Sequence, residues 1–336
     1  MVTIRDIAKL TGYSITTISK AMNDYPDVAK KTKEKILKVC EEQNYVPNAL
    51  GRNLSTKRTY TIGVVFSEET NQGITHPFFG ELLNYLKIEV EKYGYDILLL
   101  GNTVGKRVKS YLSHCLQKSV DGVIILSAYP EEEGIKELVN SSIPKVCMQS
   151  YFPNENCFFS DNDKIMNDLV DYLVGEGHTD FGFVYGDQET YDGKHRLLGF
   201  KEGLSKYNLS ISDDKVIPGV YYTIEEGRLA GQMFLKLSKL PTCIVCSSDT
   251  LAIGLSLEFM SKGIRIPEDV SITGYDNINL STVLRPKLTT VMQDKETMAR
   301  EASLCLIKEI ESGLKHPKNH IIPAKIIKRE SVKKLN

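Results

Sequence analysis

The sequence predicts a protein of the α/β class, in which a small all-helical N-terminal domain precedes a two-lobed body with parallel sheets. The 336 residues exceed one compact core of ordinary size, so several domains are expected. Residues 1–44 show only the helical spacing of apolar positions. From residue 60 onward, helix-length segments separate apolar runs of strand length: TIGVVF, YDILLL, GVIIL, KVCMQ, FGFVY, CIVCS and VSITGY. Such alternation is typical of parallel sheets that helices cover on both faces.

Composition and cysteine usage indicate a cytoplasmic protein. No run of about 18 apolar residues predicts a membrane span, and Arg5 and Asp6 stand where a signal peptide needs its apolar core. The seven cysteines are scattered and odd in number, as reduced core thiols are. Cys243 and Cys246 form a close pair without a second ligand pair, so we expect buried strand residues and neither a metal nor another cofactor.

Charge is divided unevenly along the chain. Residues 1–58 hold eleven Lys and Arg against six Asp and Glu, whereas the remainder holds 31 basic residues against 37 acidic ones. A basic module attached to an acidic body indicates that the first domain is the part that meets a polyanion.

Two short helices are expected within the first 22 residues. Thr3 and Asp6 have the spacing of a capping box, the helical pattern breaks at Thr11-Gly12-Tyr13, and Ser14 can cap a second helix. The inward face of this second helix consists of Ile18, Ala21 and Met22. Its opposite face consists of Ile15, Thr16, Ser19 and Lys20. Two such helices form either a helix-turn-helix that enters a major groove or an ordinary helical hairpin with a solvated face.

A third helix and a hinge are expected next. The helix has Ile36, Val39 and Cys40 on its inward face. Its first turn carries Lys30, Lys31 and Lys33, which have the wrong sign for a helix N-terminus unless that end lies against phosphates. The segment after Tyr45 is too short and too polar to be stable as an isolated helix, so we expect a linker that orders on binding.

Taken together, these residues resemble the lac-repressor (LacI/GalR) family. The similarity begins with VTIRDIAKLTGYSITTISKAMN, YVPNALGRNL and TIGVVF. It continues in HPFF (76–79), DGVIIL (121–126), GHTDFGFVYG (177–186), HRLLGF (195–200), SSDTLAIG (247–254), IPEDVSITGYDN (266–277), PKLTTV (286–291) and RES (329–331). The resemblance implies a DNA-binding headpiece and an effector domain with the fold of type I periplasmic binding proteins.

The resemblance also implies domain bounds. Residues 1–44 would form the helix-turn-helix domain, 45–58 the hinge, and 59–336 the effector-binding and dimerisation domain. The first lobe would span about 59–160 and 288–325 and the second about 161–287, with the chain crossing near Asp161 and returning near Pro286. Two such lobes leave a ligand cleft at the carboxyl ends of their strands.

Residue roles in DNA binding follow from the same resemblance. Ile15, Thr16 and Lys20 fall at base-reading positions, with Ser19 on the same face, and Leu54 falls at the hinge leucine that wedges into the minor groove. Two departures weaken helices in this region. Gly51 replaces the usual alanine, at about 0.8–1 kcal/mol, and Ala29 replaces a common Ser N-cap, at about 0.5–2 kcal/mol.

The effector-binding residues implied for the cleft are Phe78, Phe79, Asp161, Arg196, Tyr222, Ser248 and Asp276. Arg196 would grip hydroxyls or a carboxylate, Asp276 would accept from hydroxyls or amines, and Tyr222 would stack on the ligand. Ser248 departs from the family's usual Asn, and Asp161 begins the second lobe.

Structural roles compete with each of these assignments. Phe78 and Tyr222 would otherwise be core aromatics, and Arg196 and Asp276 would otherwise form a structural ion pair. Asp249 is expected to cap the helix 249–262 rather than to touch ligand. The histidines without metal-ligand spacing are expected to be surface or packing residues: His76, His178 and His195.

The function implied is that of a homodimeric repressor, not an enzyme, which binds a pseudo-palindromic operator and responds to a sugar or sugar derivative. A nucleobase or nucleoside effector and control by a phosphorylated protein partner are alternatives within the family. A transport-type solute-binding protein is the alternative from another class, and the basic headpiece argues against it. The sequence contains no nucleophile–base constellation, P-loop or Gly-rich dinucleotide loop for an enzyme. The end VKKLN carries no heptad tail, which favours a dimer over a tetramer.

Overall fold

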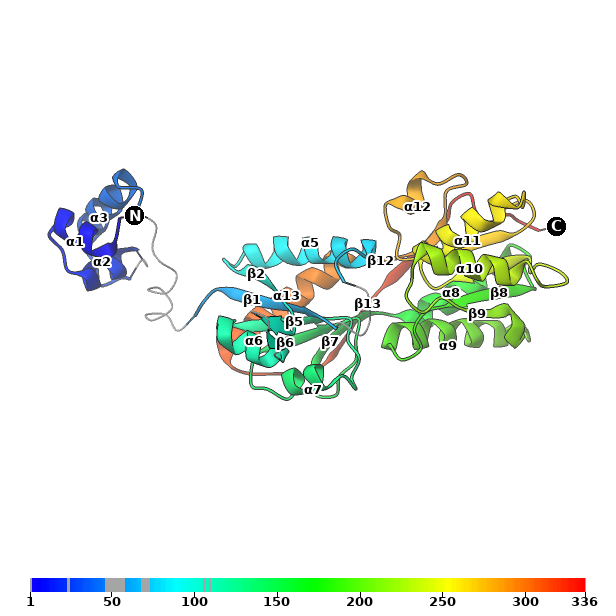
Figure 1. Cartoon of the computed structure of the whole chain (residues 1–336), viewed down its shortest axis with the longest axis horizontal. Coiled ribbons are helices and arrows are strands. Elements are labelled where there is room, and N and C mark those ends of the chain that lie inside the picture. The colour runs from blue at the N-terminus through cyan, green and yellow to red at the C-terminus, as the bar shows by residue number, and fades with distance from the viewer. Residues whose placement is uncertain are drawn as a thin grey trace. The chain divides into compact units, whose positions relative to one another are not determined.

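A computed structural model describes residues 2–22, 25–45, 58–67, 73–104, 107–108 and 110–335 (Figure 1). The chain divides into two units, Met1–Tyr60 and Thr61–Asn336. Most of the expected hinge, including Gly51 and the predicted DNA-binding residue Leu54, lies outside the described residues.

The described part of the N-terminal unit consists of three helices, α1 (Ile4–Thr11), α2 (Ile15–Met22) and α3 (Lys30–Glu42). The Asp6 carboxylate accepts the Thr3 N–H at 3.0 Å, and Gly12, at φ 75°, ends α1 in the left-handed conformation. Thr17 donates its N–H to Ser14 Oγ at 3.1 Å at the start of α2. The buried core consists of Ile7, Ile18, Ala21, Ile36 and Cys40. The predicted helix-turn-helix is therefore confirmed, and its inward face is the one expected.

The first lobe of the larger unit is built, in its described part, on a six-stranded sheet of order β13-β7-β6-β5-β1-β2. The strands are β1 (Thr61–Phe66), β2 (Asp96–Leu100), β5 (Gly122–Leu126), β6 (Lys145–Met148), β7 (Asn156–Ser160) and β13 (Asn319–Ile322). Each paired strand runs parallel to its neighbour. The helices are α5 (Pro77–Glu91) and α13 (Lys295–Ser312) on one face, and α6 (Tyr111–Lys118) and α7 (Glu133–Val139) on the other (Figure 1). A short antiparallel hairpin of β3 (Thr103–Val104) and β4 (Arg107–Val108) follows β2.

The second lobe repeats this architecture, again among the described residues, with the strand order β14-β12-β11-β10-β8-β9. Its strands are β8 (Phe181–Tyr185), β9 (Val216–Pro218), β10 (Cys243–Cys246), β11 (Ser271–Tyr275), β12 (Thr289–Gln293) and β14 (Ala324–Ile327). The last strand is antiparallel to β12, whereas the other pairs are parallel. The α-helices are α8 (Asn162–Gly175), α9 (Tyr191–Ser205), α10 (Ile224–Phe234), α11 (Asp249–Ser261) and α12 (Leu280–Val283), and a 3₁₀ turn spans Asp213–Lys215. The predicted α/β fold with two parallel-sheet lobes is thus confirmed.

The chain passes between the lobes three times. β7 ends at Ser160 in the first sheet, and α8 begins the second lobe at Asn162. The expected return near Pro286 is wrong, because β12 pairs with β11 in the second sheet and the chain crosses back only after Gln293. The free edge of β11 supplies the backbone partners that β12 needs. After β13 the chain returns once more, so that β14 completes the second sheet.

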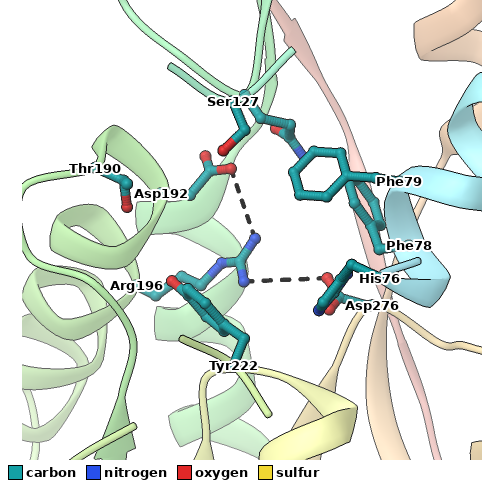
Figure 2. Close-up of a pocket in the computed structure, with 10 residues that line it drawn as sticks. His76, Phe78, Phe79, Ser127, Thr190, Asp192, Arg196, Tyr222 and Asp276 are labelled. Atoms are coloured by element: carbon teal, nitrogen blue, oxygen red, sulfur yellow. Dashed lines mark ion pairs between the residues drawn. The ribbon is translucent and has the colours of Figure 1, made fainter. Parts of the chain in front are cut away.

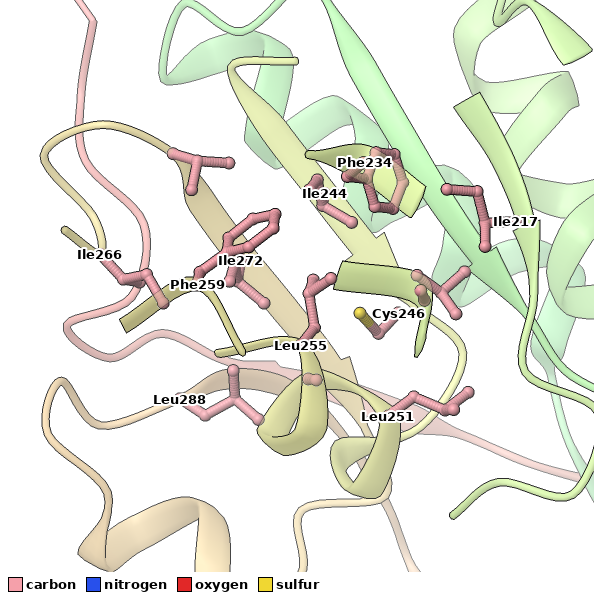
Figure 3. Packing of buried hydrophobic residues seen from close by; sticks show 14 of the residues in the cluster. Ile217, Phe234, Ile244, Cys246, Leu251, Leu255, Phe259, Ile266, Ile272 and Leu288 are labelled. Carbon is pink, nitrogen blue, oxygen red and sulfur yellow. The ribbon is translucent and has the colours of Figure 1, made fainter. Parts of the chain in front are cut away.

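Buried strands account for the apolar runs of the sequence. Every residue of β5, β6, β10 and β11 is buried, as expected for sheets with helices on both faces. In the second lobe, Phe234 and Phe259 pack over Ile244 and Ile272 of the sheet (Figure 3). All seven cysteines are free, and Cys243 and Cys246 are buried as predicted. Within the described ranges, no helix is long and apolar enough to cross a membrane, and no cluster of residues could hold a metal ion.

Helices α10 and α11 approach each other through glycines. A Cβ on Gly254 would lie 2.0 Å from the carbonyl oxygen of Ile224, and a Cβ on Gly227 would lie 2.3 Å from that of Leu251. The backbone atoms on the facing helix cannot move aside as a flexible side chain would, so the two helices cross at a distance that only glycine permits.

We therefore expect Gly254→Ala to lower the free energy of unfolding by about 1–3 kcal/mol, because the methyl group overpacks the helix crossing. Gly175→Ala is the matched control, since a Cβ there meets nothing within 4 Å, and it should be neutral or stabilising by up to about 1 kcal/mol. Urea unfolding of both variants measures the difference. Equal midpoints for the two variants would contradict the close approach.

Candidate functional site

A cavity lies where the two lobes face each other, and it has about 390 Å³ of space that no atom fills, part of it open to solvent (Figure 2). The first lobe lines it with His76, Phe78, Phe79, Ser127 and Gln149, and the second lobe with Thr190, Asp192, Arg196, Tyr222 and Asp276. The first-lobe residues follow β1, β5 and β6, and the second-lobe residues follow β8, β9 and β11. These are the carboxyl ends of parallel strands, where α/β proteins bind small ligands.

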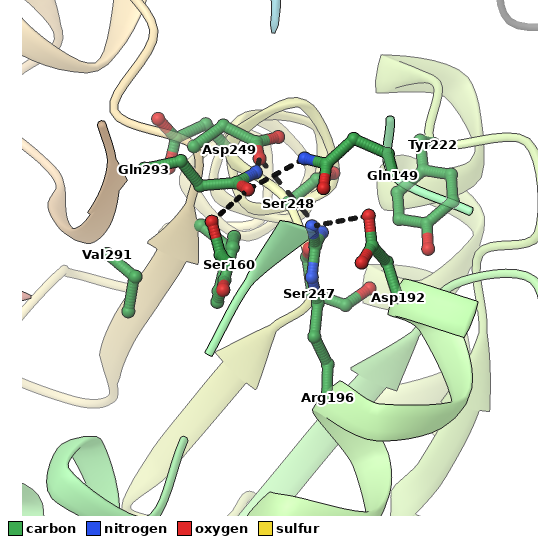
Figure 4. Close-up of polar contacts among 12 residues, drawn as sticks. Gln149, Ser160, Asp192, Arg196, Tyr222, Ser247, Ser248, Asp249, Val291 and Gln293 are labelled. Atoms are coloured by element: carbon green, nitrogen blue, oxygen red, sulfur yellow. Dashed lines mark hydrogen bonds and ion pairs between the residues drawn. The ribbon is translucent and has the colours of Figure 1, made fainter. Parts of the chain in front are cut away.

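Arg196 is the centre of the polar network on the second-lobe side (Figure 4). Its Nη1 donates to the Ser247 carbonyl at 2.7 Å, and its Nε donates to Asn162 Oδ1 at 3.2 Å. The guanidinium carbon lies 3.9 Å from the centre of the Tyr275 ring, a cation–π contact. The side chain is buried, so these contacts fix the direction in which the guanidinium points into the cavity.

Two carboxylates flank that guanidinium. Asp192 Oδ2 lies 3.7 Å from Arg196 Nη2, and Asp276 Oδ1 lies 4.0 Å from Nη1 (Figure 2). Burial raises the pKa of Asp192 and that of Asp276, while the positive charge of Arg196 opposes the rise. Burial also opposes the charge on Arg196, but Tyr275 and the two carboxylates outweigh it and raise the pKa of the guanidinium. The cavity therefore presents an alternation of acceptor, donor and acceptor, with two carboxylates against one guanidinium.

Gln293, at the end of β12, forms hydrogen bonds with residues of both lobes (Figure 4). Its Nε2 donates to Asp276 Oδ1 at 2.7 Å. Its Oε1 accepts from Gln149 Nε2 at 2.8 Å and from the Ser160 hydroxyl at 2.7 Å, both of which belong to the first lobe. The loops of the two lobes also meet where the Tyr129 hydroxyl donates to Asp187. The cavity is therefore held closed by hydrogen bonds across the lobes.

Aromatic rings form the first-lobe wall. The Phe79 ring centre lies 5.1 Å from that of Phe78 and 5.7 Å from that of His76, and His76 in turn lies 6.4 Å from Tyr222 across the cavity. Burial lowers the pKa of His76 to about 4, with help from the positive charges of Arg196 and Lys295, so the imidazole is neutral at neutral pH. This wall offers apolar surface with a single polar ring.

Several cavity residues have strained backbones. Ser127, Gln149, Tyr222 and Asp276 all have positive φ, at 45°, 54°, 55° and 109°. Such conformations are uncommon for residues other than glycine, and they cluster at functional sites where the surrounding structure holds them. The strain supports a binding role for this cavity rather than simple packing.

Five of the seven predicted effector residues line the cavity together: Phe78, Phe79, Arg196, Tyr222 and Asp276. The other two, Asp161 and Ser248, are not among the lining residues. Asp161 caps α8 by accepting the Lys164 N–H, and Ser248 caps α11 by accepting the Leu251 N–H. The expectation that Asp249 caps α11 is therefore wrong: its buried carboxyl instead accepts from Ile278 N–H and Thr290 Oγ1.

The sequence does not predict the other five residues that line the cavity: His76, Ser127, Gln149, Thr190 and Asp192. Asp192 was detectable, because it lies four residues before Arg196 and so shares its helix face. Ser127 and Gln149 directly follow apolar strand runs, which was a weaker signal. His76 packs against Phe79 and Tyr222, as expected of a packing residue, but its place in the cavity lining was not predicted.

On the headpiece, α2 presents the predicted DNA-reading face. Ile15 and Thr16 are exposed, and Ser19 and Lys20 are half-buried. Lys20 forms an ion pair with Asp27. At the start of α3, Ala29 makes no side-chain capping bond, and Lys30 and Lys31 are exposed in a first turn without acidic residues. The surface is therefore basic around the N-terminal end of α3.

Comparison with known proteins agrees with this architecture. The family of bacterial regulatory proteins named for lacI matches residues 3–48, and a periplasmic binding protein-like domain matches residues 170–332. The HTH-type transcriptional repressor PurR of Vibrio campbellii is 32% identical over the full length of both chains, and that of Histophilus somni is 31% identical, also over both full lengths. These relatives are transcriptional regulators rather than enzymes.

Solved structures share the fold. The lac repressor dimer bound to operator and the anti-inducer ONPF has a TM-score of 0.84 at 22% identity and covers 99% of each chain. The transcriptional regulator CelR in complex with cellobiose has a TM-score of 0.72 at 23% identity, over 98% of this chain and 100% of that one. A LacI family regulator from Enterococcus faecium with bound ribose has a TM-score of 0.70 at 25% identity, over 82% and 100%. The chain therefore belongs to the lacI family of bacterial regulatory proteins, and it is a DNA-binding transcriptional regulator with an effector domain.

Proposed function

We propose that the chain is a homodimeric repressor that acts in the cytoplasm on a pseudo-palindromic operator and responds to a sugar in the cavity between its lobes. The observation that carries the effector assignment is the buried Arg196 between Asp192 and Asp276. A hydroxyl group donates one hydrogen bond and accepts others, so neighbouring hydroxyls of a sugar match this sequence of acceptor, donor and acceptor. The aromatic wall supplies apolar surface for the C–H face of the same ring.

A purine or nucleoside is the second candidate, because the chain is similar over its whole length to repressors named PurR. A flat base would favour a slot between parallel rings. None of the ring pairs described around this cavity is parallel: the rings meet at 57° for His76–Phe79, 79° for Phe78–Phe79 and 82° for His76–Tyr222. This geometry favours the sugar.

Self-association is supported by an apolar surface on α10 and α11. These two helices pack against each other in the second lobe, and each also has an outer face that is exposed. The exposed apolar residues on these faces are Leu229, Met233, Leu257 and Met260. Apolar surface of this kind on adjacent helices is typical of a protein interface, and a two-fold dimer uses the same surface on both subunits.

For DNA, we propose that Ile15, Thr16, Ser19 and Lys20 of α2 contact bases and that Lys30 and Lys31 contact phosphates. Leu54, outside the described residues, is proposed as the minor-groove wedge. Selection from random DNA tests the operator. Recovery of a pseudo-palindrome supports a two-fold dimer, whereas recovery of single half-sites would contradict it.

Lys20 provides the sharper test of DNA reading. Lys20→Ala should cost roughly 1–3 kcal/mol of operator affinity and relax the preference at one base pair per half-site. Asp27→Asn, which removes the ion partner of Lys20 and a negative charge near DNA, should strengthen binding to operator and random DNA alike. Fluorescence anisotropy on operator and scrambled duplexes measures both. If Lys20→Ala loses equal affinity for the two duplexes, Lys20 contacts only the backbone.

A further inference from the structure

His76 is the N-terminal cap of α5 and lies on the first-lobe wall of the cavity (Figure 2). Both of its ring nitrogens are enclosed, and neither has a hydrogen-bond partner among the residues that the structure describes. Its ring contacts are with Phe79, tilted at 57°, and with Tyr222, edge-to-face at 82°, and its nitrogens form no hydrogen bond with either of these residues. His76 therefore brings two unsatisfied polar atoms to the cavity.

The groups around His76 keep its ring neutral. Burial opposes protonation of His76, and the positive charges of Arg196 on α9 and Lys295 on α13 oppose it further. Of the two carboxyls that flank Arg196, Asp276 is drawn beside His76 and Asp192 on the other side of the guanidinium (Figure 2). A neutral imidazole carries one donor and one acceptor nitrogen. A ligand that satisfies both ring nitrogens must therefore accept one hydrogen bond and donate another.

The two lobes differ in how well their cavity groups are satisfied. On the second-lobe side, Arg196 donates to Ser247 and Asn162, and Asp276 accepts from Gln293. On the first-lobe side, Gln149 Oε1 is, like the His76 nitrogens, buried without a partner in the described ranges. A buried polar group without a hydrogen-bond partner costs free energy. We therefore expect a bound ligand to supply the partners that these atoms lack.

We propose that His76 is an effector-binding residue of the first lobe: its ring donates one hydrogen bond to the effector and accepts another, and Gln149 Oε1 accepts a third. The second lobe holds the same ligand through Asp192, Arg196 and Asp276. Occupancy then adds hydrogen bonds that exist only when the lobes are closed, so the ligand favours the closed state through its differential affinity. This inference rests on the cavity being the effector site, as proposed above, and not on the effector being a sugar.

The ligand-free protein gives the first test. His76→Phe fills the same space without polar atoms, so it should raise the Tm of the full chain by about 2–4 °C. His178→Phe is the matched control: His178 is also buried, but its nitrogens bond to Thr242 Oγ1 at 3.0 Å and to the Lys333 carbonyl at 3.1 Å. That variant should lower the Tm. A His76→Phe protein with a lower Tm than wild type would overturn the proposal. It would mean that the His76 nitrogens of the wild type are satisfied without ligand.

Ligand titration gives the second test. Calorimetry of the wild type against D-glucose, D-galactose, D-ribose, cellobiose, hypoxanthine and guanine identifies the compound that binds. His76→Phe should weaken its binding about 10–100-fold, and His76→Gln, which keeps a donor and an acceptor, should weaken it less. Unchanged affinity in His76→Phe would overturn the proposal. If hypoxanthine or guanine binds instead of a sugar, the proposed effector class fails while the role of His76 is still tested by the same variants. If no compound binds, the effector class again fails, and the Tm comparison decides on His76.

Discussion

Replacing Arg196 with alanine should abolish the response to effector and destabilise the second lobe by about 3–5 kcal/mol. The side chain is buried and contacts groups from Asn162, Ser247 and Tyr275. Its removal leaves Asp192 and Asp276 buried without their counter-ion, which is the costly kind of ion-pair disruption. This stability cost follows only from the structure, which shows the buried groups that depend on the guanidinium.

Urea unfolding of the full chain measures the stability term. Arg265→Ala is a suitable control in the same lobe: Arg265 pairs with Asp269 on the surface, and its loss should leave the midpoint nearly unchanged. Arg196→Ala combined with Asp192→Asn should recover part of the lost stability, because one uncompensated charge is removed. Additive losses in the double variant would show that Asp192 and Arg196 do not interact.

Arg196→Lys separates the response from folding. It keeps the positive charge but loses the planar fork, so it should fold, bind operator without effector and fail to respond. Fluorescence anisotropy with labelled operator, titrated with the sugar that binds wild type, measures this. For an inducible repressor the variant would repress permanently. A variant that responds at wild-type effector concentrations would show that Arg196 does not contact the ligand.

A phosphorylated sugar should bind at least about 100-fold more weakly than its neutral parent. The cavity places two carboxylates against one guanidinium, and like charges in a buried site cost several kcal/mol. Asp192→Asn should narrow the difference about tenfold or more, because it removes one of the two negative charges. Calorimetry with D-glucose and D-glucose 6-phosphate, or the equivalent pair of the sugar that binds, measures the ratio.

Two observations check the electrostatic origin of this discrimination. Asp168→Asn, which removes a surface carboxylate paired with Lys164, should leave the ratio unchanged. Lower pH should reduce the ratio, because burial raises the pKa of both cavity carboxyls and protonation removes their charge. Equal affinity for the neutral and phosphorylated sugars at neutral pH would mean that the carboxyls are already protonated in the site.

Much of the fold could be predicted from the sequence because its signals are local. The period of apolar residues, the Thr3–Asp6 pair and the left-handed Gly12 determine α1 and α2 within a few residues of chain. Continuous apolar runs identified seven strands, and six of these are buried over most of their length because helices cover both faces of the sheet; the edge strand β2 is the exception. The ordered motifs then identified the family. Weaker runs, such as Asn156–Ser160 and Thr289–Gln293, were missed as strands.

Tertiary structure alone decided which lobe each late segment joins and which side chains share the cavity. Thr289–Gln293 belongs to the second sheet because β11 offers it a backbone edge, a fact that no local pattern carries. The segment SSDT contains two adjacent residues that can cap helix α11, Ser248 and Asp249. Ser248 is the cap because its backbone is extended, whereas the Asp249 carboxyl accepts hydrogen bonds from Ile278 and Thr290. His76, Gln149 and Asp192 meet because loops from two sheets converge at the carboxyl ends of their strands. Such meetings depend on contacts between residues tens of positions or more apart, and sequence spacing does not encode them.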